Sequence, residues 1–219
     1  MATPTTLAAE LDAELRRGSP ATTDAVRAVR KRWSARLKGE PAALVIDLAL
    51  TLLRSHGRRW VAYELVRLHA GAFAASPPHV EAFAEGLHSW DSVDAFGRIL
   101  AGPAWLRGWL DDGLILRWSA SPDRWLRRTA LVATVALNAK TDGGAGDAAR
   151  TLAVCRRLIA DRDDMVVKAM SWALRELAVR DPGAVEAFLE AYEAGLAARV
   201  KREVRHKLAT GLKTPRAHK

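Results

Sequence analysis

Two side chains in the middle of the chain, Trp90 and Asp94, have the types and the spacing to take part in chemistry. They are four residues apart, and in a helix this spacing places both side chains on one face, about one turn apart. Val93, Phe96 and Leu100 gather on another face of the same predicted helix, so the apolar face is filled without Trp90. A large indole beside an acid, outside the apolar face, is either a lid over a neighbouring helix or part of a functional site.

A simpler interpretation of Asp94 involves Arg98, which lies one turn further along the same predicted helix. An ordinary salt bridge between residues i and i+4, worth about 0.3 to 0.5 kcal/mol, would explain this pair without any function. Ser89, directly before Trp90, is a plausible N-cap for the helix.

A second helix, predicted over residues 163–180, groups a tryptophan with two cations. Lys168, Trp172 and Arg175 have the spacing i, i+4, i+7 and therefore share one face. An indole can contact or stack on a sugar or base, and the cations can bind phosphate oxygens. The alternative is that Trp172 packs under an adjacent helix while the two cations form a solvated face. The opposite, apolar face is made of Val166, Met170, Ala173, Leu174 and Leu177.

Nearly the whole chain has a 3.6-residue hydrophobic period, interrupted by short breaks that carry helix-start or helix-stop residues, and we expect an all-α fold. Gly102-Pro103 is expected to end the helix that contains Trp90 and to open another. Ser121-Pro122-Asp123 is expected to supply an N-cap, a first-turn proline and a first-turn acid. The glycine-rich segment 141–146 is expected to be a flexible loop. The predicted helices cover residues 7–17, 23–38, 41–55, 58–75, a segment from about 79, 90–102, 103–117, a segment around Trp125, 147–159, 163–180, 182–193 and 196–210.

One internal similarity indicates a repeat. The segment Asp123–Ala130 resembles Asp163–Met170, and the offset of 40 residues falls within the roughly 40 to 47 residues of HEAT-type repeats. Stacked helical hairpins bury a continuous core and curve into a concave surface that can hold a long polymer. We therefore expect a HEAT-like-repeat superhelix, an α-solenoid with a concave basic face. It would form one domain over residues 1–212, followed by a basic, disordered tail at 213–219.

The charge balance narrows the class of partner. Lys and Arg number 34 against 25 Asp and Glu, so the formal net charge of the 219-residue chain is +9. This favours a nucleic acid partner, although a basic balance also occurs in proteins that never bind one. Anionic membranes fit less well because Arg is spread over many helices, and no stretch approaches the ~20 apolar residues of a membrane span. We expect a cytoplasmic monomer, associated with the nucleoid when it binds DNA.

The remaining residue types show no pattern of nucleophilic or metal chemistry. Cys155 is the only cysteine, which excludes an intramolecular disulfide or a thiolate cluster, and its apolar neighbours indicate burial. The six histidines lack a ligand spacing such as HExxH. Asp111, Asp112 and the acids at 161–164 lie at predicted helix boundaries, where acids cap helices and complement the helix dipole.

Taken together, the two tryptophan-bearing helices resemble the DNA alkylation repair family, the HEAT-like-repeat alkylpurine DNA glycosylases. The resemblance runs in order from about Leu44 to Leu208. The blocks that carry it are Ser89-Trp90-Asp91-Ser92-Val93-Asp94, Trp125-Leu126-Arg127-Arg128-Thr129-Ala130, Lys168-Ala169-Met170-Ser171-Trp172-Ala173-Leu174-Arg175-Glu176 and Lys201-Arg202-Glu203.

The resemblance implies roles for individual residues. Asp94 matches the catalytic aspartate of the family, and Trp90 and Trp172 match the two tryptophans that flank the deoxyribose of the lesion. Arg128 matches an arginine that contacts the DNA backbone beside the lesion, and Arg175 matches a basic residue of the same cleft. The resemblance further implies that the DNA-binding residues include Lys168, Lys201 and Arg202.

The implied activity is hydrolysis of the N-glycosidic bond of cationic N3- or N7-alkylpurines in double-stranded DNA, without a metal or cofactor. The resemblance also implies that the protein holds duplex DNA in a cationic groove. It implies that the base is excised without being inserted into a pocket, unlike in base-flipping glycosylases. Two alternatives remain open. One is a catalytically weak or inactive helical-repeat module that binds DNA by shape and charge, and the other is a repeat scaffold for an acidic protein.

Overall fold

The computed structural model describes residues 3–17 and 22–212, and every regular element within these ranges is a helix. The all-α prediction is therefore confirmed. The chain forms two compact units, residues 1–86 and residues 87–219, and each is described by itself. The single domain over 1–212 stays a prediction, and the tail at 213–219 lies outside the described residues. None of the described helices combines the length and apolar composition that a membrane crossing requires.

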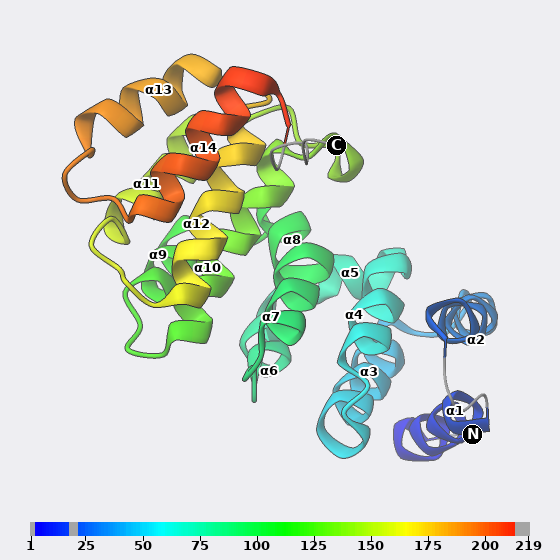
Figure 1. The fold of residues 1–219 in the computed structure, drawn as a ribbon. Coiled ribbons are helices and arrows are strands. Elements are labelled where there is room, and N and C mark those ends of the chain that lie inside the picture. The colour runs from blue at the N-terminus through cyan, green and yellow to red at the C-terminus, as the bar shows by residue number, and fades with distance from the viewer. Residues whose placement is uncertain (1–2, 18–21, 213–219) are drawn as a thin grey trace. The chain divides into compact units, whose positions relative to one another are not determined.

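In the first unit, α3 is the central helix. It packs against α1, α4, α5 and α6, while α2 packs against α1 and α4 (Figure 1). Thr22 caps α2, since its side chain accepts a hydrogen bond from the Ala25 amide. The elements of this unit are α1 (Pro4–Arg17), α2 (Thr23–Arg36), α3 (Ala42–His56), α4 (Arg59–Leu68), α5 (Ala70–Ala75), the short 3-10 helix η1 (Pro77–His79) and α6 (Val80–Ala84).

The single helix expected over residues 58–75 is wrong, because the chain breaks at His69. His69 has an extended conformation, with φ −98° and ψ 106°, and its Nδ1 accepts a hydrogen bond from the Ala72 amide at 3.0 Å. The imidazole thus caps α5 as an Asn or Ser side chain would. The hydrophobic period continues across this break, so periodicity alone could not locate it.

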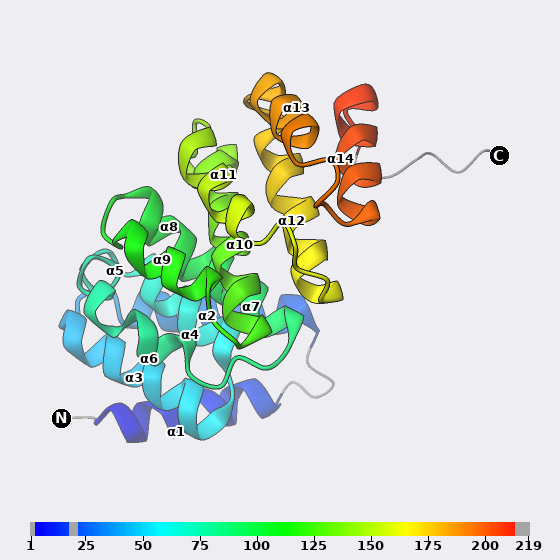
Figure 2. The ribbon, with the colours of Figure 1, turned by 90° about the vertical axis from the view of Figure 1, so that its left-hand side faces the viewer.

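In the second unit, two sets of helices alternate along the chain. α10, α12 and α14 pack side by side, and α9, α11 and α13 pack against them, so that successive pairs form stacked hairpins (Figure 2). α10 is the central helix and also contacts α7 and α8. The elements are α7 (Trp90–Phe96), the π-helical turn η2 (Gly97–Ala101), α8 (Gly102–Leu106), α9 (Asp112–Ser119), α10 (Arg124–Asn138), the 3-10 turn η3 (Lys140–Asp142), α11 (Ala148–Arg157), α12 (Asp164–Leu177), α13 (Pro182–Ala191) and α14 (Ala198–Thr210).

The helix boundary predicted at Gly102-Pro103 is also wrong. The helix that begins at Trp90 passes through the π turn η2 and ends only at Leu106, and the next helix begins at Asp112. A π turn shifts the hydrogen-bond ladder by one residue, which accommodates a proline that has no N–H to donate. Gly102 permits close packing on α10, since a Cβ there would lie 2.7 Å from the Ala133 carbonyl oxygen.

Aspartates begin most helices of the second unit. The side chain of Asp123 accepts from the Trp125 amide at 2.9 Å, so Asp123, and not Ser121, is the N-cap of α10. Asp111 and Asp163 cap α9 and α12 in the same way. The interpretation of Asp111 and Asp163 as caps is therefore confirmed, whereas the placement of Asp123 in the first turn is wrong.

Candidate functional site

Trp90 is the first residue of α7, and a reciprocal cap fixes the start of this helix. Ser89 and Ser92 form a capping box in which the Ser89 amide donates to Ser92 Oγ at 3.3 Å. The predicted N-cap is thus confirmed. The indole of Trp90 does not pack into the core, since the residue is 59% exposed. An indole this exposed on a fixed helix start is available to a partner molecule.

Asp94, one turn after Trp90, is held by an arginine from α10. Arg128 Nε donates to Asp94 Oδ1 at 3.0 Å, and Arg128 Nη2 donates to Asp94 Oδ2 at 2.9 Å. A third bond, from Arg128 Nη1 to the Met165 carbonyl oxygen at 2.5 Å, ties the guanidinium to the start of α12. This two-pronged geometry fixes both the position and the orientation of the carboxylate.

Burial raises the pKa of Asp94 above its ordinary value, and the charge and hydrogen bonds of Arg128 oppose the rise without cancelling it. The Asp94 side chain is 22% exposed, and that of Arg128 is 7% exposed. The carboxylate is therefore a partly desolvated charge with an opening to solvent. A charge in such surroundings acts more strongly on a nearby cation than it would in water.

The salt bridge expected between Asp94 and Arg98 is wrong. Arg98 Nη2 instead donates to Asp142 Oδ2 of η3 at 2.8 Å. The Arg98 guanidinium carbon also lies 5.8 Å from the ring centre of Trp172, within reach of a cation–π contact. Arg98 therefore links the helix of Asp94 to the indole of α12, and its positive charge acts on Asp94 only through space.

The predicted face of α12 is confirmed by burial. The residues of its apolar side are buried, whereas Lys168, Trp172 and Arg175 are partly exposed. Trp172 Nε1 donates to Glu176 Oε1 at 3.2 Å, and Arg175 Nε donates to the Ser171 carbonyl oxygen at 3.0 Å. The indole of Trp172 is thus held by Glu176 of its own helix and by Arg98 of η2.

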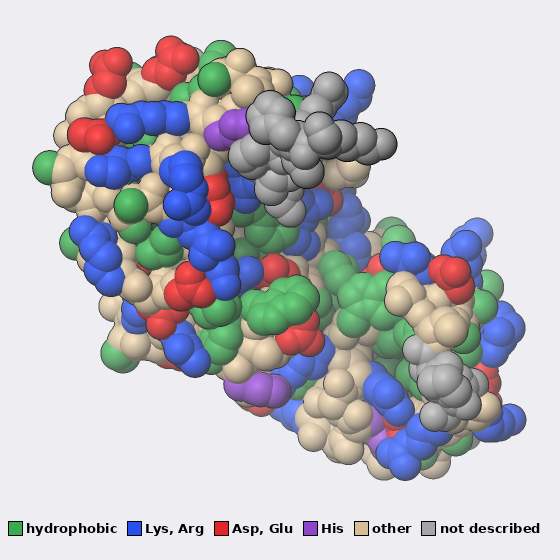
Figure 3. Space-filling view, in the orientation of Figure 1, with side chains coloured by type: hydrophobic (Ala, Val, Ile, Leu, Met, Phe, Trp, Pro, Cys, Tyr) green, Lys and Arg blue, Asp and Glu red, His purple; other side chains and the backbone are tan. Residues whose placement is uncertain are grey.

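The other basic residues predicted to bind DNA have local acidic partners. Lys168 pairs with Asp164 at 2.6 Å. Lys201 of α14 pairs with the Glu193 carboxylate at 3.4 Å. Arg202, with a side chain 72% exposed, makes only a 4.0 Å contact with Glu203 among the described residues. Lys and Arg side chains interspersed with Asp and Glu cover the visible face of α12 and α14 (Figure 3).

The structure thus forms two separate pairs among the site residues: Arg128 holds Asp94, and Arg98 contacts the ring of Trp172. Trp90 lies one turn from Asp94, and Arg175 lies one turn from Trp172. Arg128, to which the resemblance assigns a DNA contact, is buried beneath Asp94. In this arrangement it positions the carboxylate.

Asp142 is a partner of Arg98 that the sequence did not indicate. It is 44 residues from Arg98 and lies in the glycine-rich segment expected to be a flexible loop. A second arginine, Arg180, fixes the same segment by donating to the carbonyl oxygens of Asn138 and Gly144, both at 2.9 Å. No short-range spacing could have paired these residues.

Nucleophilic and metal chemistry find little support in the described part of the chain. Cys155 is buried, and its burial raises the pKa of the thiol to about 12, so it stays protonated at neutral pH. Within residues 3–17 and 22–212, no group of three or more His, Cys, Asp or Glu side chains is arranged to hold a metal ion.

Comparison with known proteins shows similarity to a described family and to a solved structure. Residues 20–208 match the family described as DNA alkylation repair enzyme. A solved structure described as a predicted DNA alkylation repair enzyme from Enterococcus faecalis shares the fold, with a TM-score of 0.66 at 18% sequence identity over 93% of this chain and 95% of that chain. No curated protein matches the sequence. Since the family match spans most of the chain, this protein belongs to the DNA alkylation repair enzyme family.

Proposed function

We propose that the protein is a DNA glycosylase that hydrolyses the N-glycosidic bond of cationic N3- or N7-alkylated purines in duplex DNA. Membership of the alkylation repair family supports a repair substrate. The observation that carries the proposal is the Asp94 carboxylate, which Arg128 fixes in a partly desolvated position one turn after the exposed indole of Trp90.

The chemistry suits a carboxylate that needs neither a metal nor a proton donor. An N3- or N7-alkylpurine already carries a positive charge, so the bond from its glycosidic nitrogen to C1′ of the deoxyribose breaks with the electron pair leaving on the base. The base departs neutral, and the sugar acquires oxocarbenium character. Asp94 would stabilise this developing cation electrostatically. A water molecule then forms the new bond to C1′ and loses a proton to solvent.

The two tryptophans would form the walls of the sugar site. Trp90 offers an exposed indole one turn before the carboxylate, and a ring face can stabilise a nearby cation by about 0.5 to 2 kcal/mol. Trp172 is oriented by Arg98 and Glu176. Lys168, Arg175, Lys201 and Arg202 would contact phosphates, which position the duplex and carry no sequence information.

A second candidate function is a module that binds DNA by shape and charge with little or no catalysis. One observation favours it: both oxygens of Asp94 are already occupied by Arg128, whose charge offsets the carboxylate. Under this proposal the Asp94–Arg128 pair is a structural tie between α7 and α10. DNA binding would then be steeply salt-dependent, and no base would be released.

The deciding experiment measures free base released from duplex DNA that contains N7-methylguanine. We expect release by the wild-type protein and a loss of about 10²-fold or more in Asp94→Asn, the range found when one preorganised electrostatic group is removed. Asp91→Asn is the matched control, because it removes an exposed acid from the same helix. Equal rates for Asp94→Asn and wild type would rule out the catalytic role of Asp94. Tight binding without any release would support the second candidate.

A further inference from the structure

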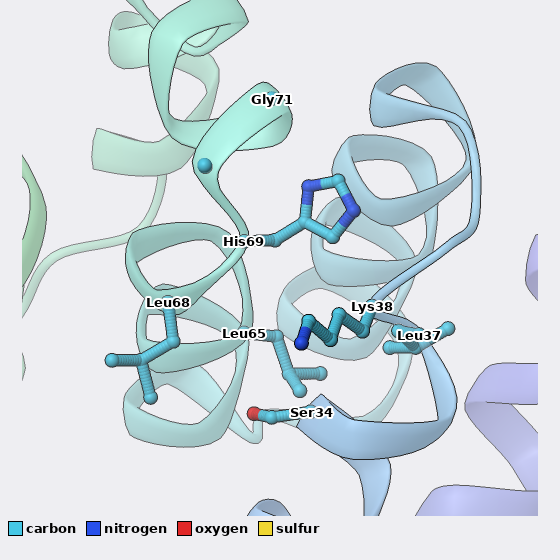
Figure 4. Close-up of a pocket in the computed structure, with 8 residues that line it drawn as sticks. Ser34, Leu37, Lys38, Leu65, Leu68, His69 and Gly71 are labelled. Atoms are coloured by element: carbon cyan, nitrogen blue, oxygen red, sulfur yellow. The ribbon is translucent and has the colours of Figure 1, made fainter.

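A pocket of about 240 Å³ lies in the first unit, between α2, α4 and the start of α5. It is made entirely from residues of this unit and plays no part in the proposed chemistry. Its walls are mainly aliphatic, and three polar side chains interrupt them. The lining residues are Ser34, Leu37, Lys38, Leu65, Leu68, His69, Ala70 and Gly71 (Figure 4).

Two of the polar side chains in this wall are incompletely hydrogen-bonded. Ser34 Oγ and His69 Nε2 are buried, and neither has a hydrogen-bond partner among the described residues. The state of the His69 ring follows from its cap on α5. Its Nδ1 accepts a hydrogen bond from Ala72, so the neutral ring carries its hydrogen on Nε2. His69 Nε2 is therefore a donor, and the Ser34 hydroxyl can donate as well.

Lys38 adds a positive charge to these two donors. Its side chain extends toward α4 between the His69 ring and Ser34 (Figure 4). Lys38 has no ion-pair partner within the part of the chain that the structure describes. Leu68, 55% exposed, contributes an apolar side chain to the same wall. The pocket therefore combines three donors, one of them charged, with aliphatic walls.

We propose that this pocket binds a small carboxylate with a short apolar chain. The carboxylate would accept hydrogen bonds from Lys38, Ser34 and His69, and the chain would lie against the leucines. An acceptor such as a carboxylate suits this wall, because Lys38 and His69 Nε2 can only donate and the Ser34 hydroxyl can donate as well. The volume lies below the 300 to 1,000 Å³ of pockets for drug-sized ligands. At about 30 Å³ per water molecule, the pocket has room for roughly eight water molecules. This volume suits a six-carbon acid better than a nucleotide.

The test is a titration of the full-length protein with sodium hexanoate at constant pH and ionic strength, followed by amide chemical shifts in NMR. We expect saturable shifts at Ser34, Lys38 and Gly71. The comparison probe is 1-hexanol, which has the same chain without the charge and should bind at least about fivefold more weakly, as for loss of a charge-assisted hydrogen bond. Inorganic phosphate, an anion without the chain, should give no saturable shifts at these residues.

Variants assign the binding to the three donors. Lys38→Gln and Ser34→Ala should each weaken hexanoate binding about fivefold or more. His69→Asn should weaken it while keeping a side-chain cap for α5. Lys31→Gln, an exposed lysine of α2 outside the pocket, is the matched control and should bind as wild type does. Absence of saturation, equal binding of hexanol, or unchanged binding in both Lys38→Gln and Ser34→Ala would overturn the proposal and leave the pocket as a site for water.

Discussion

Replacing Arg128 with methionine should destabilise the protein strongly at neutral pH and much less in acid. Methionine keeps the aliphatic stem but removes both hydrogen bonds to Asp94 and the bond to the Met165 carbonyl oxygen. The Asp94 carboxylate is then left partly buried without its positive partner. Its ionised form, already disfavoured by burial, becomes still less favourable.

The sign of the pH dependence follows from the direction of this pKa shift. A carboxyl group whose pKa is raised by folding contributes stability below its unfolded-state pKa, and this contribution is lost as the pH rises through the folded-state pKa. Arg128 limits that loss in the wild-type protein. Without Arg128 the pKa of Asp94 rises further, so the loss at neutral pH becomes larger.

The size of the destabilisation by Arg128→Met follows from how exposed the Asp94 and Arg128 side chains are. Removing one partner of a fully buried pair costs about 3 to 5 kcal/mol. Asp94 keeps 22% of its side-chain surface in water, so we expect about 2 to 3 kcal/mol at neutral pH, within the range for hydrogen bonds to a charged group. For a chain of this size that corresponds to a fall of about 4 to 12 °C in Tm. In acid the Asp94 carboxyl is neutral, so Arg128→Met loses only the bond to Met165 and weaker bonds to this carboxyl. The expected loss of stability in acid is therefore about 1 kcal/mol.

Thermal unfolding of wild type, Arg128→Met, Asp94→Asn and the double variant, followed by circular dichroism at pH 7.5 and in acid, tests this reasoning. The double variant lacks the carboxylate and should lose the excess pH dependence. Arg127→Met, which breaks the neighbouring 2.7 Å ion pair with Asp161, is the control for loss of an arginine from the same turn of α10. An equal destabilisation by Arg128→Met at both pH values would refute the argument.

Three further outcomes are expected. Gly102→Ala should cost about 1 to 3 kcal/mol by chemical denaturation, because the new Cβ would lie 2.7 Å from the Ala133 carbonyl oxygen; an unchanged or increased stability would contradict the close packing. Cys155 should react with a thiol reagent only after unfolding, since its thiol is buried with a pKa of about 12, and rapid labelling of the native protein would count against this. Arg98→Met should cost about 1 kcal/mol or less, as for a partly exposed pair with Asp142, and should change the tryptophan fluorescence; identical spectra would argue against its contact with the indole.

Local sequence features predicted most of the helices correctly, and they failed where tertiary contacts compete. The confirmed caps at Ser89, Asp111 and Asp163 act within one turn of chain, so residue type and position suffice to find them. The break at His69 was missed because histidine is an unusual cap and the apolar period runs across it. The boundary at Gly102-Pro103 was misplaced because close packing on α10 keeps the chain helical there.

Local residue spacing was enough to identify which residues could belong to the candidate site, whereas helix packing sets how they are paired. Helical spacing placed Trp90 with Asp94 and Lys168 with Trp172, because residues three or four apart share a face whatever surrounds the helix. Helical spacing did not identify the partner of Asp94. Arg98 is near in sequence, but Arg128 holds the carboxylate from 34 residues away, and Arg98 turns to Asp142. Such pairings depend on how α7, α10 and α12 pack, which no local pattern encodes.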